Sequence, residues 1–321
     1  MASYFVKHQT QVSIPVGLVP DAENGTLRRG QRGASFAIAQ HFTSGKSGPG
    51  IVSMPTGSGK TAVLMLAPFL LDAQRVLVIT PSRLVRTQIS GEFKNLSQLR
   101  RAGVIPARMA GPKVREVEHR VGSREAWERL AKFDVIVGTP AVVSPAVKGV
   151  SAPSEDFFDL ILVDEAHHNS AHTWKTLLDE FPNARRVLFT ATPFRRDNRE
   201  IKGHFIYTYP LSQAYNDRIF GEIAFHPVAE IQGVENDVAI ALEAERVFQE
   251  DQAAGLDHIL MVRADTKKRA HELAEVYAEK TQLKLAVIDS DRTYPKFVRL
   301  SRASMRRKGC RSNSTASSAS T

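Results

Sequence analysis

The chain has 321 residues, of which 42% are hydrophobic and 24% charged, a composition typical of a soluble globular protein long enough for two domains. Lysine and arginine exceed aspartate and glutamate by 43 to 34, and this net charge of +9 fits a polyanionic partner such as nucleic acid as well as it fits a merely basic surface. A single cysteine excludes an intrachain disulfide and a cysteine-rich metal site, and the longest apolar run is too short for a membrane span, so we expect a cytoplasmic protein with no membrane partner.

The start of the chain shows little hydrophobic periodicity, so we expect an irregular lead-in over 1–26, with one edge strand near Val12–Val16. Apolar residues then recur every three or four positions from Ala34 to Phe42. This spacing predicts an amphipathic helix.

The segment from Ile51 to Thr61 joins a short apolar run to a glycine-bracketed turn that ends in Lys60 and Thr61. This order predicts a strand, a loop that turns its N–H groups toward phosphate, and a helix. Lys60 would reach the β- and γ-phosphates of ATP, and the Thr61 hydroxyl would bind Mg²⁺. The usual glycine or alanine six residues before the lysine is replaced by Met54, so an ordinary glycine-rich turn stays open as the alternative. The predicted nucleotide-binding residues here are Thr56, Gly57, Ser58, Gly59, Lys60 and Thr61.

Further short apolar runs predict buried strands at Arg75–Thr80, Phe133–Val137, Phe158–Val163 and Arg186–Phe189. Helical segments alternate with them, which favours an α/β fold with a parallel sheet covered by helices on both faces. Each of these strands ends at a candidate motif, and such sheets bind ligands at the carboxyl ends of their strands. Between them we also predict a short strand at Val104–Ile105 and a helix over Glu116–Leu130.

An acidic pair, Asp164 and Glu165, directly follows the strand predicted at Phe158–Val163. Asp164 is suited to hold Mg²⁺ through water together with Thr61, and Glu165 to accept a proton from an attacking water. The histidines that begin at His167 would also suit zinc, but a zinc site leaves the glycine-rich loop unexplained.

Three segments occur in order at predicted strand ends: Thr56–Thr61, Asp164–His167 and Thr190–Pro193. Together they resemble the superfamily 2 helicases of the DEAD/DEAH-box type, and most of all the helicase subunits of type III restriction enzymes. The resemblance implies a RecA-like P-loop NTPase fold with a partial second RecA-like domain. The implied division is an ATP-binding domain at 27–210 and the partial domain at 234–290. The hydrophobic pattern blurs over 211–233, which predicts a linker, and the basic, serine-rich composition of 291–321 predicts a disordered tail.

In the second domain the sequence predicts helices at Val238–Glu250 and after Asp265, which would cap the second helix, and strands at His258–Val262 and Leu283–Ile288. Periodicity is lost after the last strand, and the arginine-rich motif that the family carries in this domain is not found. We therefore expect a chain that is truncated or frame-shifted at this end.

The resemblance assigns roles to residues at matching positions. Lys60, Asp164, Glu165 and His167 correspond to catalytic residues. Gln31 corresponds to a glutamine that reads adenine, with an exposed polar residue as the alternative, because its surroundings match only in part.

Nucleic-acid contacts and coupling also follow from the resemblance. Thr190 and Thr192, together with His167, correspond to the link between the nucleotide site and the bound strand. The loops that grip the nucleic-acid backbone correspond to Thr80, Pro81, Arg83, Gly138 and Thr139, for which ordinary turn chemistry is the alternative.

The implied function is a nucleic-acid-dependent ATPase that uses ATP and Mg²⁺ to translocate on or unwind nucleic acid, with DNA favoured over RNA. A module that binds ATP and nucleic acid without productive turnover is the alternative, because the second domain is incomplete. A P-loop kinase would leave Thr190 and Thr192 without a role. No nuclease motif is found, so cleavage would need a partner chain.

Overall fold

The computed structural model describes residues 3–14, 26–166, 172–192, 201–221, 224–229, 235–256 and 259–288, without the side chains of 172–175. The chain divides into two compact units, Met1–Glu222 and Ile223–Thr321, and each is described by itself. The predictions for His167, for a zinc site among its neighbouring histidines and for the tail at 291–321 lie outside the described residues.

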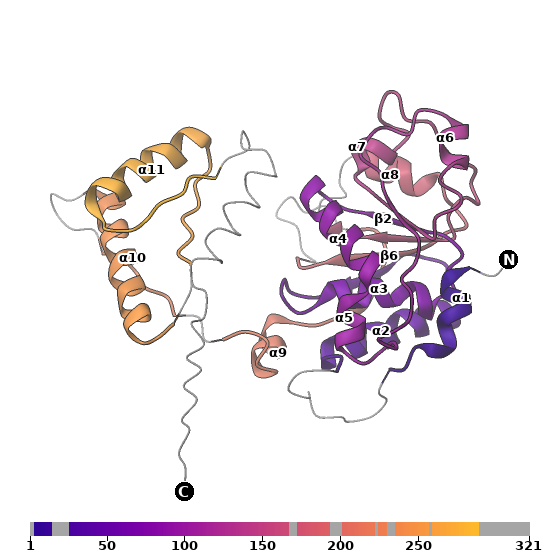
Figure 1. Cartoon of the computed structure of the whole chain (residues 1–321), viewed down its shortest axis with the longest axis horizontal. Coiled ribbons are helices and arrows are strands. Elements are labelled where there is room, and N and C mark those ends of the chain that lie inside the picture. Colours follow the sequence, from indigo (N-terminus) through magenta and orange to yellow (C-terminus); the bar gives the residue numbers. More distant parts are fainter. Residues whose placement is uncertain are drawn as a thin grey trace, which may run out of the picture. The chain divides into compact units, whose positions relative to one another are not determined.

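The first unit is built on a seven-stranded sheet in which neighbouring strands run parallel, in the order β3-β4-β2-β5-β6-β1-β7 (Figure 1). The central strands are apolar and buried at nearly every position, as a sheet covered on both faces requires. The strands are β1 Gly50–Ser53, β2 Val76–Ile79, β3 Val114–Glu116, β4 Val135–Gly138, β5 Leu160–Val163, β6 Arg185–Thr190 and β7 His204–Thr208.

Helices cover both faces of this sheet, with α2, α3 and α5 on one side and α6, α7 and α8 on the other (Figure 1). The predicted amphipathic helix is α2. The helices of the first unit are α1 Tyr4–His8, α2 Arg29–Thr43, α3 Lys60–Leu70, α4 Arg83–Asn95, α5 Ser97–Arg101, α6 Arg124–Glu128, α7 Pro140–Val143, α8 His172–Asp179 and α9 Leu211–Asn216, with a 3-10 turn at Gln9–Gln11.

Alternate residues along each strand enter two separate hydrophobic clusters, because successive side chains of a strand point to opposite faces. Val78 and its neighbours pack against α2 and α3, whereas Leu77 packs with Trp127 of α6 and Leu177 of α8. The predicted α/β fold, a RecA-like parallel sheet with helices on both faces, is confirmed. Within the described residues, no helix combines the length and the apolar character needed to cross a membrane.

Two predictions between β2 and β4 are wrong. Val104–Ile105 is a buried turn rather than a strand: Gly103 precedes it at φ +63°, and the Val104 carbonyl accepts from the Ser13 N–H at 2.8 Å. The segment Glu116–Leu130 begins at the last residue of the edge strand β3. Its helix spans only Arg124–Glu128, and it starts there because the Ser123 hydroxyl caps it.

Two further differences concern edge strands. No strand is assigned to Val12–Ile14, the described part of the expected edge strand. β7, which the sequence analysis did not anticipate, is half-exposed and lies at the edge of the sheet beside β1.

The described part of the second unit consists of α10 Asn236–Ala253 and α11 Lys267–Lys280. The two predicted strands are wrong where the structure describes them: 259–262 and 283–288 carry no strand, and Ile259 is 78% exposed. A buried strand needs paired neighbours, and none is present in the described part of this unit. Asp265 does not cap α11; the Thr266 hydroxyl does so by accepting from the Arg269 N–H.

Candidate functional site

The carboxyl ends of five neighbouring strands bring the predicted motifs to one edge of the sheet. In sheet order, β4 ends at Gly138, β2 precedes Thr80, β5 precedes Asp164, β6 ends at Thr190, and β1 precedes Met54. Backbone hydrogen bonds join this edge beyond the strands, with 2.9 Å from the Met54 N–H to the Thr190 carbonyl and 3.0 Å from the Thr80 N–H to the Gly138 carbonyl. Adjacent strands lie about 4.8 Å apart, so these motifs are immediate neighbours.

The glycine-rich loop between β1 and α3 needs glycine at two positions. Gly57 and Gly59 have φ of +84° and +92°, in the left-handed region that glycine adopts readily. A Cβ on Gly59 would lie 2.1 Å from Nε2 of Gln31. Ser58 faces inward, and its hydroxyl donates to the Pro55 carbonyl at 2.6 Å. The Ser58 side chain therefore holds the loop in shape, and the predicted role of Ser58 in nucleotide binding stays a prediction.

The start of α3 offers a cradle of amide donors. Within the described residues, the N–H groups of Gly59, Lys60 and Thr61 have no protein acceptor, as expected for the first turn of a helix. These donors and the helix dipole suit phosphate oxygens. Met54, the departure from the usual loop pattern, has a side chain fully buried in the core. The larger residue is therefore accommodated without entering the cradle.

Lys60 forms an ion pair with Glu165, whose Oε1 lies 2.7 Å from the lysine Nζ. The two side chains are only 10% and 24% exposed, so water screens the pair weakly. Glu165 has a φ of +51°, an uncommon conformation for a residue with a side chain, and its N–H donates to Oδ1 of Asp164 at 3.1 Å. The backbone turn after β5 thus directs the glutamate toward the loop.

Asp164 is a buried carboxylate. Burial raises its pKa above the usual aspartate value, the neighbouring Glu165 carboxylate raises it further, and Lys60 acts in the opposite direction. Two carboxylates against one lysine suit a hard cation. Mg²⁺ keeps several of its waters and binds phosphates, so one or two protein ligands are enough to hold it. Asp164 and Thr61 are the residues that would hold it.

Gln31 is buried against the glycine-rich loop, so the alternative of an exposed polar residue does not hold. Its Oε1 accepts from the Arg28 N–H at 2.8 Å, and its Nε2 donates to the Gly59 carbonyl at 3.2 Å. The glutamine therefore connects the start of α2 to the loop.

Thr190 and Thr192 lie beside the loop at the end of β6. Thr190 is fully buried, and its Oγ1 accepts from the Thr192 N–H at 3.2 Å. Thr192 is exposed. The pair forms a compact turn between the acidic pair and the loop.

The five residues expected to contact nucleic acid divide into two groups. Thr80, Gly138 and Thr139 are buried, so their side chains are not at the surface, and their contact with nucleic acid stays a prediction. A Cβ on Gly138 would meet a methyl group of Val143 at 2.6 Å. Pro81 is partly exposed and Arg83 fully exposed, so the surface part of this region is the start of α4.

Two residues with no role assigned from sequence also touch the loop. Nη1 of Arg28 donates to the Gly57 carbonyl at 3.2 Å, and the ring of Phe220 lies 3.3 Å from where a Cβ on Gly57 would be. Phe220 follows α9 in a segment without periodicity, so the sequence contains no signal that would have placed it here.

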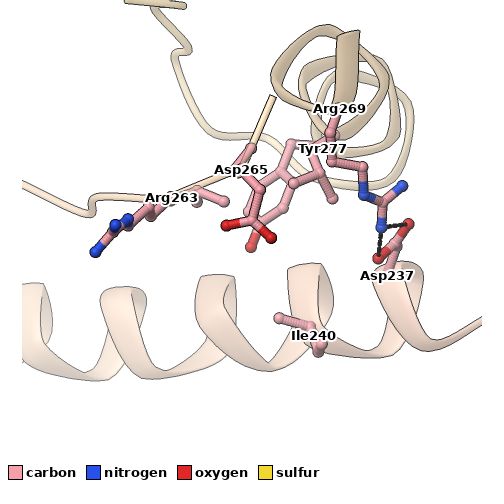
Figure 2. A pocket seen from close by; sticks show the side chains of 9 residues that line it. Asp237, Ile240, Arg263, Asp265, Arg269 and Tyr277 are labelled. Carbon is pink, nitrogen blue, oxygen red and sulfur yellow. Dashed lines mark hydrogen bonds and ion pairs between the residues drawn. The ribbon is translucent and has the colours of Figure 1, made fainter. Parts of the chain in front are cut away.

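The second unit has a pocket of about 260 Å³ between α10, α11 and the segment before α11. Arg269 and Asp237 close one side with hydrogen bonds of 2.5 and 2.6 Å, and Asp265 and Tyr277 point into the space (Figure 2). None of the predicted site residues lines this pocket.

Comparison with known proteins finds relatives among restriction enzymes and helicases. The chain is 38% identical over 96 residues to the Type I restriction enzyme EcoAI endonuclease subunit of Escherichia coli, a match that covers 27% of this chain and 11% of that protein. It is 26% identical over 155 residues to the ATP-dependent RNA helicase DRS1 of Eremothecium gossypii, covering 44% of this chain and 20% of that protein.

A solved structure of a nuclease-deletion mutant of the Type ISP restriction-modification enzyme LlaGI, in complex with a DNA substrate mimic, is also similar. That match has a TM-score of 0.42 and 18% identity, and it covers 71% of this chain and 22% of that chain. The chain spans less than a quarter of the length of each of these three relatives.

A family model, described as Type III restriction enzyme, res subunit, matches residues 24–195, which is more than half of the 321-residue chain. The matched region contains the glycine-rich loop, the acidic pair and Thr190. The resemblance inferred from the three motifs is thereby confirmed. The chain belongs to the family of type III restriction enzyme res subunits.

Proposed function

We propose that this chain is a helicase-type ATPase whose turnover depends on nucleic acid. The observation that carries this proposal is the 2.7 Å ion pair between Lys60 of the glycine-rich loop and Glu165, beside the buried Asp164. A phosphate cradle, a lysine, a metal-binding carboxylate and a general base are the parts that hydrolysis of a nucleoside triphosphate requires. Family membership supports the same conclusion.

The site residues have distinct roles in this proposal. The N–H groups at the start of α3 bind phosphate oxygens, and Lys60 leaves Glu165 to reach the β- and γ-phosphates. The freed Glu165 carboxylate then accepts a proton from the attacking water. Asp164 and Thr61 hold Mg²⁺, which when bound supplies positive charge to the phosphoryl oxygens. His167, Thr190 and Thr192 link this site to the bound strand, as the family resemblance implies.

Nucleic acid is the partner that we propose, with DNA favoured over RNA. The net charge of +9 and the exposed Arg83 at the start of α4 suit phosphate contacts. Membership of the restriction-enzyme family favours DNA. One of the relatives is an RNA helicase, so RNA must be tested beside DNA. We further propose that hydrolysis drives translocation or unwinding, that any cleavage comes from a partner chain, and that the protein acts in the cytoplasm.

A second candidate is a module that binds ATP and nucleic acid without turnover. The observation that favours it is the second unit, whose described part forms two helices and no strand. A helicase-type ATPase needs both of its domains to neutralise charge in the transition state. The two candidates share the nucleotide site and differ in the rate of hydrolysis.

The test is the rate of phosphate release from ATP by the full chain, alone and with single-stranded DNA, double-stranded DNA or RNA. We expect DNA to raise the rate, and Glu165→Gln to lower it by about 10²- to 10⁴-fold while ATP still binds. Glu128→Gln, at an exposed side chain of α6, is the matched control and should leave the rate unchanged. Binding without hydrolysis would favour the second candidate, and hydrolysis that persists in Glu165→Gln would contradict the assignment of the base.

A further inference from the structure

The order of the strands fixes the direction in which a nucleotide lies across the glycine-rich loop. The loop follows β1, and the acidic pair follows β5, on the side of β1 where β6 lies. A triphosphate that places its γ-phosphate at Lys60 and Glu165 and extends away from the acidic pair would direct its nucleoside to the other side of β1, where β7 lies. This step rests on the proposed function, since it assumes that the loop binds a nucleoside triphosphate.

Phe220 lies on that side of the loop. It follows β7 and α9, and its ring is 3.3 Å from where a Cβ on Gly57 would be. The ring is only partly buried: one part packs against the hydrophobic core that contains α2 and α3, and the rest is open to solvent. The exposed part of this aromatic ring, against a polar loop, is available to a planar ligand.

The position of Phe220 is fixed by contacts on both sides of α9. Oδ2 of Asp217 accepts from the Tyr209 hydroxyl at 2.7 Å, and Oδ1 lies 3.4 Å from Nη1 of Arg29 at the start of α2. The Ile219 N–H donates to the carbonyl of the buried Ala214 at 2.9 Å. These contacts attach the segment to β7 and α2, so the ring is held beside the loop before any ligand binds.

We propose that Phe220 is the surface on which the base of the bound nucleotide stacks. Every nucleobase has a π-face that stacks on an aromatic ring, so this contact adds affinity for any base. The exposed guanidinium of Arg28, bonded to the Gly57 carbonyl, is a second planar group at the same loop residue. Phe220 thus supplies affinity for the nucleoside, separately from the phosphate contacts of the cradle.

The test compares two probes in equilibrium titrations of the full chain: ATP, which has a base, and inorganic tripolyphosphate, which has none. In Phe220→Ala and Phe220→Leu we expect ATP affinity to fall by about 5- to 100-fold and tripolyphosphate affinity to stay as in the wild type. Phe220→Tyr, which keeps the ring, should retain ATP affinity. Tyr215→Ala, at an exposed aromatic residue of α9, is the control and should change neither.

Each other outcome decides against the proposal in a distinguishable way. Wild-type ATP affinity in Phe220→Ala overturns the stacking role. An equal loss for both probes in Phe220→Ala and Phe220→Leu assigns the ring to the structure of the loop and also overturns it. A wild-type chain that binds tripolyphosphate as tightly as ATP overturns the stacking role but leaves the phosphate site in place. A wild-type chain that binds neither probe overturns the proposed function as well.

Discussion

The negative charge of Asp164 lowers the stability of the fold because the carboxylate is buried. The residue is 9% exposed, and burial followed by repulsion from Glu165 raises the pKa of its carboxyl group above the usual value. A carboxyl group whose pKa is raised on folding favours the folded state while it is protonated and loses that contribution as pH rises through the raised pKa. The ionised Asp164 therefore lowers the stability of the free protein at neutral pH, in exchange for a group that can hold a cation.

Replacing Asp164 by asparagine should therefore stabilise the fold and abolish the activity. We expect Asp164→Asn to have a higher melting temperature than the wild type at pH 8, because the buried negative charge is gone. The difference should shrink as pH falls through the raised pKa, where the wild-type carboxyl group is neutral too. Thermal unfolding from pH 3, below the usual aspartate pKa, to pH 8 measures this, and a difference independent of pH would contradict the assignment.

The loop between β1 and α3 depends on backbone conformation more than on side chains. Its glycines at 57 and 59 have positive φ, and Gln31 fills the space beside Gly59. Gly45 also has a positive φ of +77°, but nothing lies within 4 Å of where its Cβ would be. Alanine at Gly45 would have only the free-energy cost of a positive φ, whereas alanine at Gly59 would have that cost and the cost of displacing Gln31 as well.

Alanine at either glycine should destabilise the fold, more strongly at Gly59, and only the change at Gly59 should weaken ATP binding. Strain at positive φ should cost each variant about 1–2 kcal/mol in the free energy of unfolding, and Gly59→Ala should lose more because its Cβ also displaces Gln31. Only Gly59→Ala displaces the amide of Gln31 from the loop, so we expect ATP affinity to fall at least about tenfold in this variant alone. Denaturant unfolding and ATP titration test the two variants. Equal ATP affinity in both would contradict the claim that ATP binding depends on the contact between Gln31 and the loop.

The buried central elements could be predicted from sequence, and the edge elements could not. β2, β4, β5 and β6 are apolar on both faces, so their runs are visible without knowledge of their neighbours. β7 is half-exposed, and β3 contains the charged Arg115 and Glu116, which resemble a solvated helix. Glu116 is instead paired with Arg86 of α4 at 2.8 Å, a contact between distant residues that no local pattern reveals.

In the candidate site, too, some features could be predicted from the sequence and others could not. The glycine-rich loop and the acidic pair are contiguous motifs, so the sequence alone predicts Lys60 and Glu165 at strand ends on one edge of the sheet; the structure places them after β1 and β5, with β6 between the two strands. The burial of Thr80 and Thr139 and the approach of Phe220 to Gly57 depend on how separate segments pack. In the second unit, apolar runs predicted strands whose pairing partners are not in the described residues.

At the scale of the whole molecule, the excess of positive charge should govern binding to DNA. Affinity for a polyanion falls with salt because bound counterions are released, with a log–log slope of about −0.9 per phosphate contacted. We expect Arg83→Ala to weaken binding equally for different DNA sequences and to reduce the size of the slope by about 1. Arg124→Ala, at an exposed arginine of α6, is the control. An unchanged slope in Arg83→Ala would remove the start of α4 from the nucleic-acid surface.

The measurement that tests the central claim most directly is equilibrium binding of ATP, with Mg²⁺, to the full chain and to its Lys60→Ala variant. If the loop, Lys60 and the acidic pair form a nucleotide site, the wild type binds ATP and Lys60→Ala binds it at least about tenfold more weakly, since a lysine that contacts phosphate is lost. Lys94→Ala, near the end of α4, should bind ATP as the wild type does. A wild type that does not bind ATP, or a Lys60→Ala variant that binds it equally well, would contradict the account.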